Sequence, residues 1–206
     1  VGADEVFVMS TGVIGTQLPM DKIGQGVRAA SDLLGDDWNA AAHGIMTTDT
    51  RPKMASVTVT TADGGSYTIA GIAKGAGMIA PNMATMLGFI VTDAALEPQY
   101  AADMLFASAD TTFNRIVVDG DTSTNDTVFL LANGASGVTI SAAEREQFVV
   151  ALTDVCRKLA QDIVRDGEGA TKFITLHVTG APDDAAARQI ANAIGTSPLV
   201  KTAFYG

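Results

Sequence analysis

The stretch from Lys74 to Ala94, which reads KGAGMIAPNMATMLGFIVTDA, constrains the fold of this chain most strongly. Its first half is rich in glycine and holds one lysine, and its second half is an apolar run with the length of a buried strand. Ala84 and Thr85 stand between the halves, where a loop becomes a strand. The sequence therefore predicts a special loop that leads a hydroxyl side chain to the start of a buried strand.

The remaining patterns predict paired strands and separate helices. Helical spacing or start signals occur at 19–35, 38–45, after Pro98, from the capping-box match at 141–144 onward and after Pro182. Short apolar or alternating runs predict strands at 6–9, 57–60, 67–72, 116–118, 128–131 and 172–178, and Asp63-Gly64-Gly65 predicts a hairpin turn. The last residues, 199–206, are expected to lack a closing helix. Paired strands and separate helices indicate an α+β fold.

Composition narrows the class of protein. The 206 residues suffice for one sizeable domain, and 47% apolar with 17% charged residues is a globular composition. The formal charge of −10 makes nucleic acid and anionic membranes poor partners. No apolar run has the length of a membrane span. The single cysteine, Cys156, excludes an intrachain disulfide and a cysteine metal cluster, and His43 and His177 match no metal spacing. We expect a cytoplasmic protein without a bound metal.

The two ends of the sequence indicate a fragment of a longer polypeptide. Val1 opens the sequence without a methionine, almost directly on an apolar run, and the last residues stop in an apolar stretch. No composition shift marks a linker, so we expect residues 1–206 to form one core.

Thr85 is the candidate nucleophile. A threonine hydroxyl becomes a good nucleophile when a base lies beside it, and its own α-amino group is such a base once it is free. That amine has a reference pKa of about 7.7–8.0, which suits general-base work near neutrality. The hypothesis requires cleavage of the Ala84–Thr85 bond, through attack of the hydroxyl on the preceding carbonyl. The simpler interpretation, a threonine that merely begins a strand, remains open at this point.

Three other features have both a functional and a plain interpretation. Thr11 and Gly12, in a turn after a predicted strand, could donate to an oxyanion or form an ordinary turn. Glu168, between two glycines, could recognise a cationic group or be an exposed loop charge. Gly71 to Gly77 with Lys74 suggests a phosphate loop, but the P-loop order is absent, so close backbone packing is favoured.

Five segments together resemble the bifunctional ornithine acetyltransferase (glutamate N-acetyltransferase) family of arginine biosynthesis. They are STGVIG at 10–15, LPMDKI at 18–23, TTDT at 47–50, KGAGMIAPNMATMLGFIVTDA at 74–94 and RDGEGATK at 165–172. They follow the family's order from end to end. Family chains are longer and usually continue into an asparagine-tryptophan-glycine motif that this sequence lacks, which agrees with a fragment.

The resemblance implies a self-cleaving enzyme. It implies a layered α/β/β/α architecture that is similar to N-terminal-nucleophile hydrolases but differs from them in connectivity. The implied junction gives an α chain, 1–84, and a β chain, 85–206, that stay associated, and αβ units pair as (αβ)2. The implied site consists of the nucleophile Thr85, the oxyanion hole Thr11 and Gly12, and the substrate-binding residues Thr47, Lys74, Thr85 and Glu168. Two further substrate residues of the family lie beyond Gly206.

The implied reaction is ping-pong acetyl transfer from N2-acetyl-L-ornithine to L-glutamate through an acetyl-threonine ester, with no metal or organic cofactor. Family members differ in whether acetyl-coenzyme A is also a donor. Two rival interpretations remain. One is an N-terminal-nucleophile aminopeptidase or amidase, which passes the acyl group to water. The other is an unprocessed binding protein without enzymatic activity.

Overall fold

A four-stranded sheet organises the part of the chain that the computed structural model describes, residues 2–3, 6–80 and 86–205. Its strands are β1 (Lys53–Thr60), β2 (Ser66–Lys74), β3 (Leu87–Thr92) and β4 (Thr127–Ala132), in that order across the sheet. The helices are α1 (Met20–Ser31), α2 (Trp38–Gly44), α3 (Pro98–Thr111), α4 (Arg145–Arg165), α5 (Asp184–Gly195) and α6 (Pro198–Tyr205), with a 3-10 turn η2 (Phe113–Arg115). The predicted α+β class is confirmed.

The predicted hairpin at Asp63-Gly64-Gly65 joins β1 to β2. The two strands pair antiparallel, and the Gly65 carbonyl accepts a hydrogen bond from the Thr61 N–H at 2.9 Å. β2 and β3 are also antiparallel, whereas β3 and β4 are parallel. Because a parallel pair needs a crossover connection, α3 lies between β3 and β4 in the sequence and packs beside α4.

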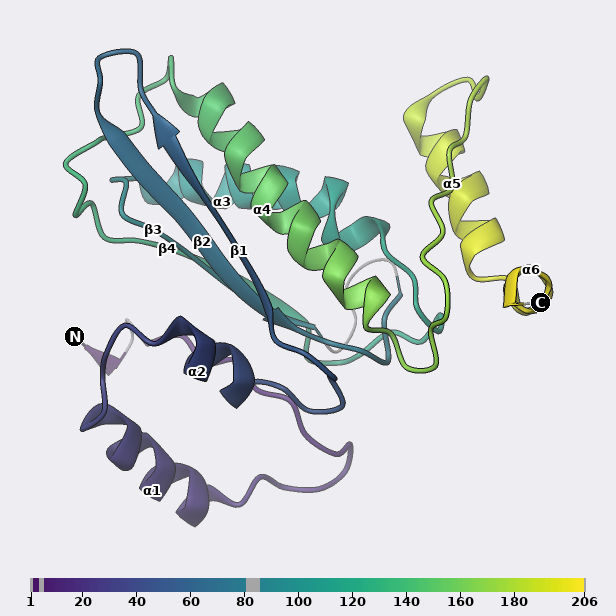
Figure 1. The fold of residues 1–206 in the computed structure, drawn as a ribbon, viewed down its shortest axis with the longest axis horizontal. Coiled ribbons are helices and arrows are strands. Elements are labelled where there is room, and N and C mark those ends of the chain that lie inside the picture. The colour runs from purple at the N-terminus through teal and green to yellow at the C-terminus, as the bar shows by residue number, and fades with distance from the viewer. Residues whose placement is uncertain (1, 4–5, 81–85, 206) are drawn as a thin grey trace.

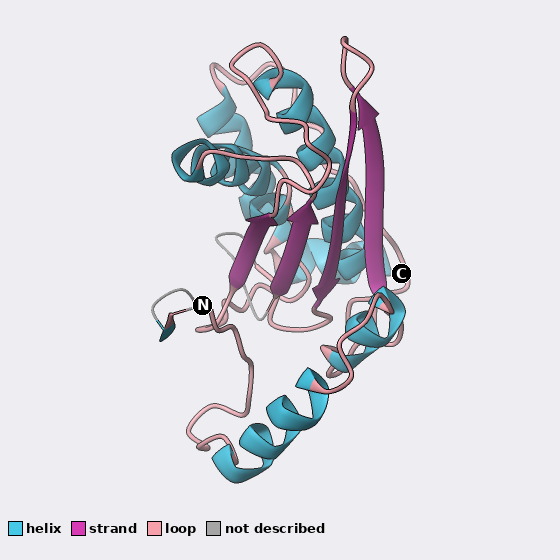
Figure 2. Cartoon of the chain, turned by 90° about the vertical axis from the view of Figure 1, so that its left-hand side faces the viewer, coloured by secondary structure: helices cyan, strands magenta, loops and turns pink. Residues whose placement is uncertain are grey.

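The longest helix covers one face of the sheet. α4 crosses β1 and β2 and has α3 at its side, and Figures 1 and 2 show both helices on the same face. The five residues of its predicted apolar stripe are all buried: Phe148, Leu152, Val155, Leu159 and Ile163. The ring of Phe148 stacks on Tyr67 of β2 with centroids 5.7 Å apart. Each such aliphatic or aromatic side chain contributes about 1.5–3 kcal/mol by leaving water, so this stripe holds helix and sheet together.

The opposite face of the sheet receives the N-terminal region. Side chains alternate along a strand, so Phe89 points away from the face on which its neighbour Ile90 is buried. The ring of Trp38, the first residue of α2, lies 6.3 Å from the ring of Phe89. α2 thus brings residues 45–52, which follow it, to the end of the sheet where β1 begins (Figure 1).

Three predicted strands are wrong. Residues 6–9, 116–118 and 172–178 have no strand pairing in the described part of the chain. Apolar alternation alone does not create a strand, because the backbone also needs a neighbouring strand with which to pair. The expectation of no closing helix is wrong as well, since α6 covers Pro198–Tyr205. None of the described helices combines the length and the apolar character needed to cross a bilayer.

Candidate functional site

The predicted cleavage site, Ala84–Thr85, lies outside the described residues, but the chain on both sides of it is buried. Ile79 and Ala80 are 2% and 5% exposed on the N-terminal side, and Met86 is 2% exposed on the C-terminal side. Met86 is held from the loop before β4. Its N–H donates to Oδ1 of Asp126 at 2.6 Å, and its carbonyl accepts from the Thr127 N–H at 3.1 Å. The segments that flank the predicted scissile bond are therefore anchored in the interior.

A strained turn begins the approach to the predicted cleavage site. Met78 has φ 53°, and it is the one non-glycine residue with positive φ in the ranges described. Such a backbone conformation costs about 1–3 kcal/mol and persists only where the surroundings hold it. Asp119 supplies that support, since its carboxylate accepts from the N–H groups of Met78 at 2.5 Å and Ile79 at 2.9 Å.

The structure brings Lys74 and Thr47 together. Lys74 ends β2 with 1% of its surface exposed, and its Nζ donates to Oγ1 of Thr47 at 3.3 Å. Burial lowers the pKa of the Lys74 ammonium, and the nearby charges of Asp49 and Asp126 partly oppose that shift. The site therefore contains an ammonium group that is almost completely shielded from water and lies beside a hydroxyl group.

Glu168 lies against the same glycine-rich loop that follows Lys74. Its N–H donates to the carbonyl of Ala76 at 2.7 Å, while its side chain is exposed. A Cβ added at Gly77 would lie 2.9 Å from the carboxyl carbon of Glu168, so a larger residue at 77 would displace this carboxylate from its place against the loop. The glycines of the loop serve close packing, in agreement with the sequence-based preference over a phosphate loop.

Thr11 and Gly12 are not joined to these residues. They lie in the extended segment before α1, with Thr11 partly buried and Gly12 exposed. Over residues 6–80 and 86–205, neither of them makes a hydrogen bond to Thr47, Lys74 or Glu168. Their role as an oxyanion hole stays a prediction.

A buried ion cluster beside the site was not predicted from the sequence. Lys53, at the start of β1, is fully buried, and its Nζ lies 2.5 Å from Oδ1 of Asp49 and 2.6 Å from Oδ2 of Asp166. Burial disfavours the charged form of both aspartates, but hydrogen bonds from Lys53 and neighbouring groups outweigh it and keep both pKa values below the ordinary value. Asp49 and Asp166 are part of the motifs TTDT and RDGEGATK, which was the available signal.

Asp126 is a second residue that sequence reasoning missed. One carboxylate oxygen holds the N–H of Met86, and the other, Oδ2, is buried with no hydrogen-bond partner in the described structure. Burial raises the pKa of Asp126 to about 6, although the Met86 N–H and the charge of Lys74 favour ionisation. A carboxyl group that titrates near neutrality thus lies next to the residue that follows Thr85.

The raised pKa of Asp126 predicts a pH-dependent stability. The folded protein binds this proton more tightly than the unfolded chain does, so the free energy of unfolding falls as pH rises from 3.8 to about 6 and stays lower above that. The amide of Asp126→Asn can still accept from Met86 but carries no charge. We expect the melting temperature of this variant, relative to wild type, to increase across that interval and then level off. Thermal melts from pH 4 to 8 measure this, and parallel profiles would contradict it.

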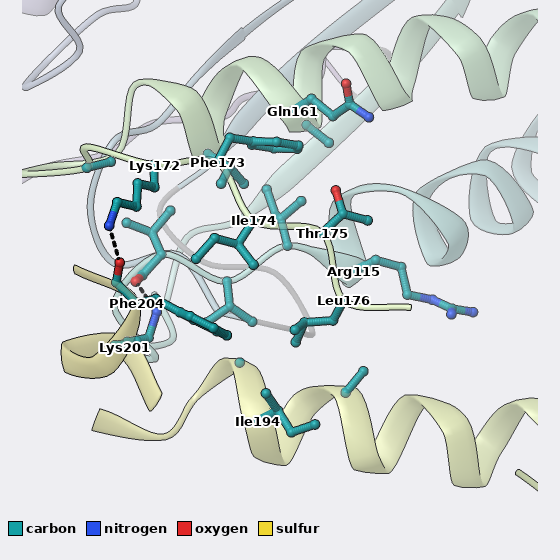
Figure 3. Close-up of a pocket in the computed structure, with 18 of the residues that line it drawn as sticks. Arg115, Gln161, Lys172, Phe173, Ile174, Thr175, Leu176, Ile194, Lys201 and Phe204 are labelled. Atoms are coloured by element: carbon teal, nitrogen blue, oxygen red, sulfur yellow. Dashed lines mark hydrogen bonds between the residues drawn. The ribbon is translucent and has the colours of Figure 1, made fainter. Parts of the chain in front are cut away.

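A separate hollow lies between the C-terminal end of α4 and the two last helices (Figure 3). It has Glu168 in its wall but neither Thr47 nor Lys74. Phe173, Ile174, Leu176 and Phe204 line it, and the ammonium of Lys201 is satisfied by the Val118 carbonyl at 2.7 Å. Charged side chains also belong to the lining, among them Arg115, Arg157, Lys172 and Arg188. No group of three His, Cys, Asp or Glu side chains that could hold a metal occurs among the described residues.

Comparison with known proteins decides the family. A model of the ArgJ family matches residues 1–206. The chain belongs to the ArgJ family. It is 52% identical over 211 residues to the mitochondrial arginine biosynthesis bifunctional protein ArgJ of Chaetomium globosum, an alignment that covers 98% of this chain and 45% of the relative. It is 53% identical over 214 residues to arginine biosynthesis bifunctional protein ArgJ of Geobacter sulfurreducens, covering 100% of this chain and 54% of the relative.

The chain thus spans about half the length of the curated ArgJ relatives it matches. Among solved structures, it is similar to ArgJ of Bacillus halodurans, with 47% sequence identity and a TM-score of 0.57 over 59% of each chain. The sequence-based resemblance to this family is confirmed.

Proposed function

We propose that this ArgJ-family chain carries the core of a self-cleaving acetyltransferase that moves the acetyl group of N2-acetyl-L-ornithine to L-glutamate in arginine biosynthesis. The observation that carries the proposal is the family match across residues 1–206, which includes the whole Lys74–Ala94 motif. Relatives at 52% and 53% identity bear the name arginine biosynthesis bifunctional protein ArgJ.

The proposed nucleophile is the hydroxyl of Thr85. In the precursor it attacks the Ala84 carbonyl, and the bond from that carbon to the Thr85 nitrogen breaks, which frees the α-amine and leaves an ester. Water then hydrolyses the ester and releases the Thr85 hydroxyl and the Ala84 carboxylate. The amine then takes the proton of the same hydroxyl. Support comes from the flanks, because Asp119 holds the strained turn at Met78 and Asp126 holds Met86. These contacts fix the two described segments that flank the junction.

Acetyl transfer proceeds in two balanced steps. The Thr85 oxygen bonds to the acetyl carbon, the bond from that carbon to the ornithine nitrogen breaks, and the proton passes to the leaving amine. The amine of glutamate then attacks the acetyl carbon, the bond from that carbon to the Thr85 oxygen breaks, and a proton of the attacking amine passes to that oxygen. Thr11 and Gly12 donate to the oxyanion of each tetrahedral intermediate, a contribution of about 2.7–4 kcal/mol for one donor. The chemistry is complete without a metal or an organic cofactor.

Lys74 and Glu168 recognise substrate groups of opposite charge. We assign the buried ammonium of Lys74, with Thr47 beside it, to a substrate carboxylate. The reason is that a cation shielded from water attracts an anion more strongly than a solvated cation does. The exposed carboxylate of Glu168 is assigned to a substrate ammonium. Both substrates carry a carboxylate, and both ornithine and glutamate carry an amine that enters or leaves.

The proposed organisation is a single core with a junction at Ala84–Thr85, whose α chain, 1–84, and β chain, 85–206, remain associated and pair as (αβ)2. β2 belongs to the first chain and β3 to the second, and their ladder would keep the two chains together after cleavage. Acetyl-coenzyme A is a further donor to assay. The proposed compartment is the cytoplasm, in which the buried free thiol of Cys156 stays reduced.

A donor assay with the purified full-length protein tests the function. We expect acetylglutamate and ornithine from acetylornithine plus glutamate, and little acetate without glutamate. An aminopeptidase or amidase would instead release acetate at the same rate with and without glutamate. A non-enzymatic binding protein would form neither product.

A further inference from the structure

The buried ammonium of Lys53 connects two loops that are distant in sequence. Its two carboxylate partners are Asp49, in the loop between α2 and β1, and Asp166, which caps the C-terminal end of α4. The C-terminal end of a helix carries partial negative charge, so an aspartate there is unfavourable unless a cation compensates it. Lys53 provides that cation with a fully buried Nζ.

Asp49 accepts hydrogen bonds from backbone N–H groups at Thr47 and next to Lys74. Its Oδ1 accepts from the N–H of Gly75, next to Lys74, at 2.7 Å, and its Oδ2 accepts from the N–H of Thr47 at 3.1 Å. The Asp49 carboxylate therefore holds the 47–50 loop at a fixed distance from the end of β2. At this distance the Lys74 ammonium donates a hydrogen bond to Thr47.

Asp166 extends the connection to the loop of Glu168. It accepts hydrogen bonds from the N–H of Thr50 at 3.0 Å and from the Thr50 hydroxyl, and it stands two residues before Glu168. The N–H of Glu168 in turn donates to Ala76. The loops 47–50, 75–77 and 166–168 thus form a closed ring of hydrogen bonds, with Lys53 between the two carboxylates.

A simple stabilising role explains this cluster poorly. Taking ions out of water costs several kcal/mol each, and buried ion pairs replaced by apolar residues often leave stability unchanged or higher. What a buried cluster does provide is fixed geometry, because each oxygen accepts from specific donors. In this chain the backbone donors belong to the loops that carry Thr47 and Lys74, and the acceptor Asp166 belongs to the loop of Glu168.

We propose that Lys53, acting through Asp49 and Asp166, is a positioning residue that holds Thr47, Lys74 and Glu168 in register for substrate. The proposal rests on the proposed function, since it takes these three residues as the substrate contacts. Lys53 itself touches no substrate. Without its charge, the carboxylates of Asp49 and Asp166 repel each other and the three loops lose their common anchor.

Lys53→Met in the full-length protein tests the proposal. We expect KM for acetylornithine and for glutamate to rise on the order of ten- to a hundredfold, because displacements near 1 Å at a site cost that much. At saturating substrate, kcat of the folded, cleaved protein should fall far less. Lys158→Met is the matched control, since Lys158 pairs with Asp162 on the exposed face of α4. Wild-type turnover in the same assay establishes the proposed function independently of the variant.

A milder variant decides the matter if Lys53→Met fails to fold or to cleave itself. Thr50→Val keeps the shape but removes the hydroxyl donor to Asp166, and it leaves no buried charge unpaired. A raised KM with a melting temperature close to that of wild type supports positioning. Wild-type KM values in the folded fraction of either variant, with only the melting temperature lowered, overturn it.

Discussion

In the full-length protein, Thr85→Ala yields one uncleaved chain without acetyltransferase activity. Alanine has no hydroxyl to attack the Ala84 carbonyl, so the bond stays intact and no free amine appears at residue 85. The acetyl-threonine ester cannot form either. Removing the nucleophile of a hydrolytic triad costs on the order of 10⁶ in kcat, and we expect a loss of that size here. Denaturing gels report the cleavage, and production of acetylglutamate reports the transfer.

Thr85→Ser is the matched control for this substitution. It keeps a hydroxyl and, after cleavage, an α-amine, so both reactions should persist at a reduced rate. Two chains and full acetyl transfer from Thr85→Ala would contradict the assignment of the nucleophile.

Lys74→Met should be the next most damaging change. Losing one partner of a buried, hydrogen-bonded charge pair costs about 2–5 kcal/mol, so KM for both amino-acid substrates should rise on the order of a hundredfold. Methionine has a similar shape and no charge, and at a position 1% exposed it should preserve the fold and self-cleavage. Saturation kinetics with each substrate in turn measure the effect.

The control for Lys74→Met is Lys22→Met, which removes an exposed lysine of α1. We expect its KM values to equal those of wild type. A Lys74→Met enzyme with unchanged KM would remove Lys74 from the substrate site while leaving the nucleophile assignment intact.

Local patterns were enough to predict the elements that build the sheet and its covering helix. The five-residue stripe of α4 and the Asp63-Gly64-Gly65 turn are confirmed because their determinants lie close together in sequence. The runs at 6–9, 116–118 and 172–178 have similar apolar content but no strand beside them in the described structure. Pairing is a non-local property, which the residues of one segment do not encode.

For the candidate site, too, contacts between residues that are distant in sequence were not predicted. Spacing alone favoured Thr85 only weakly, and the family resemblance supplied the assignment of Lys74, Thr47 and Glu168. The contact of Lys53 with Asp166 joins residues 113 positions apart, and that of Thr50 with Asp166 joins residues 116 apart. No periodicity reports such a contact. The aspartates were visible within the quoted motifs, but their shared lysine was not.

In the proposed mechanism, the bond between Ala84 and Thr85 must break to create the nucleophile. Intact mass combined with N-terminal sequencing of the purified full-length protein tests it most directly. We expect two associated chains, one of which begins Thr85-Met86-Leu87. A single intact chain after long incubation, or a new N-terminus at any other residue, would contradict it.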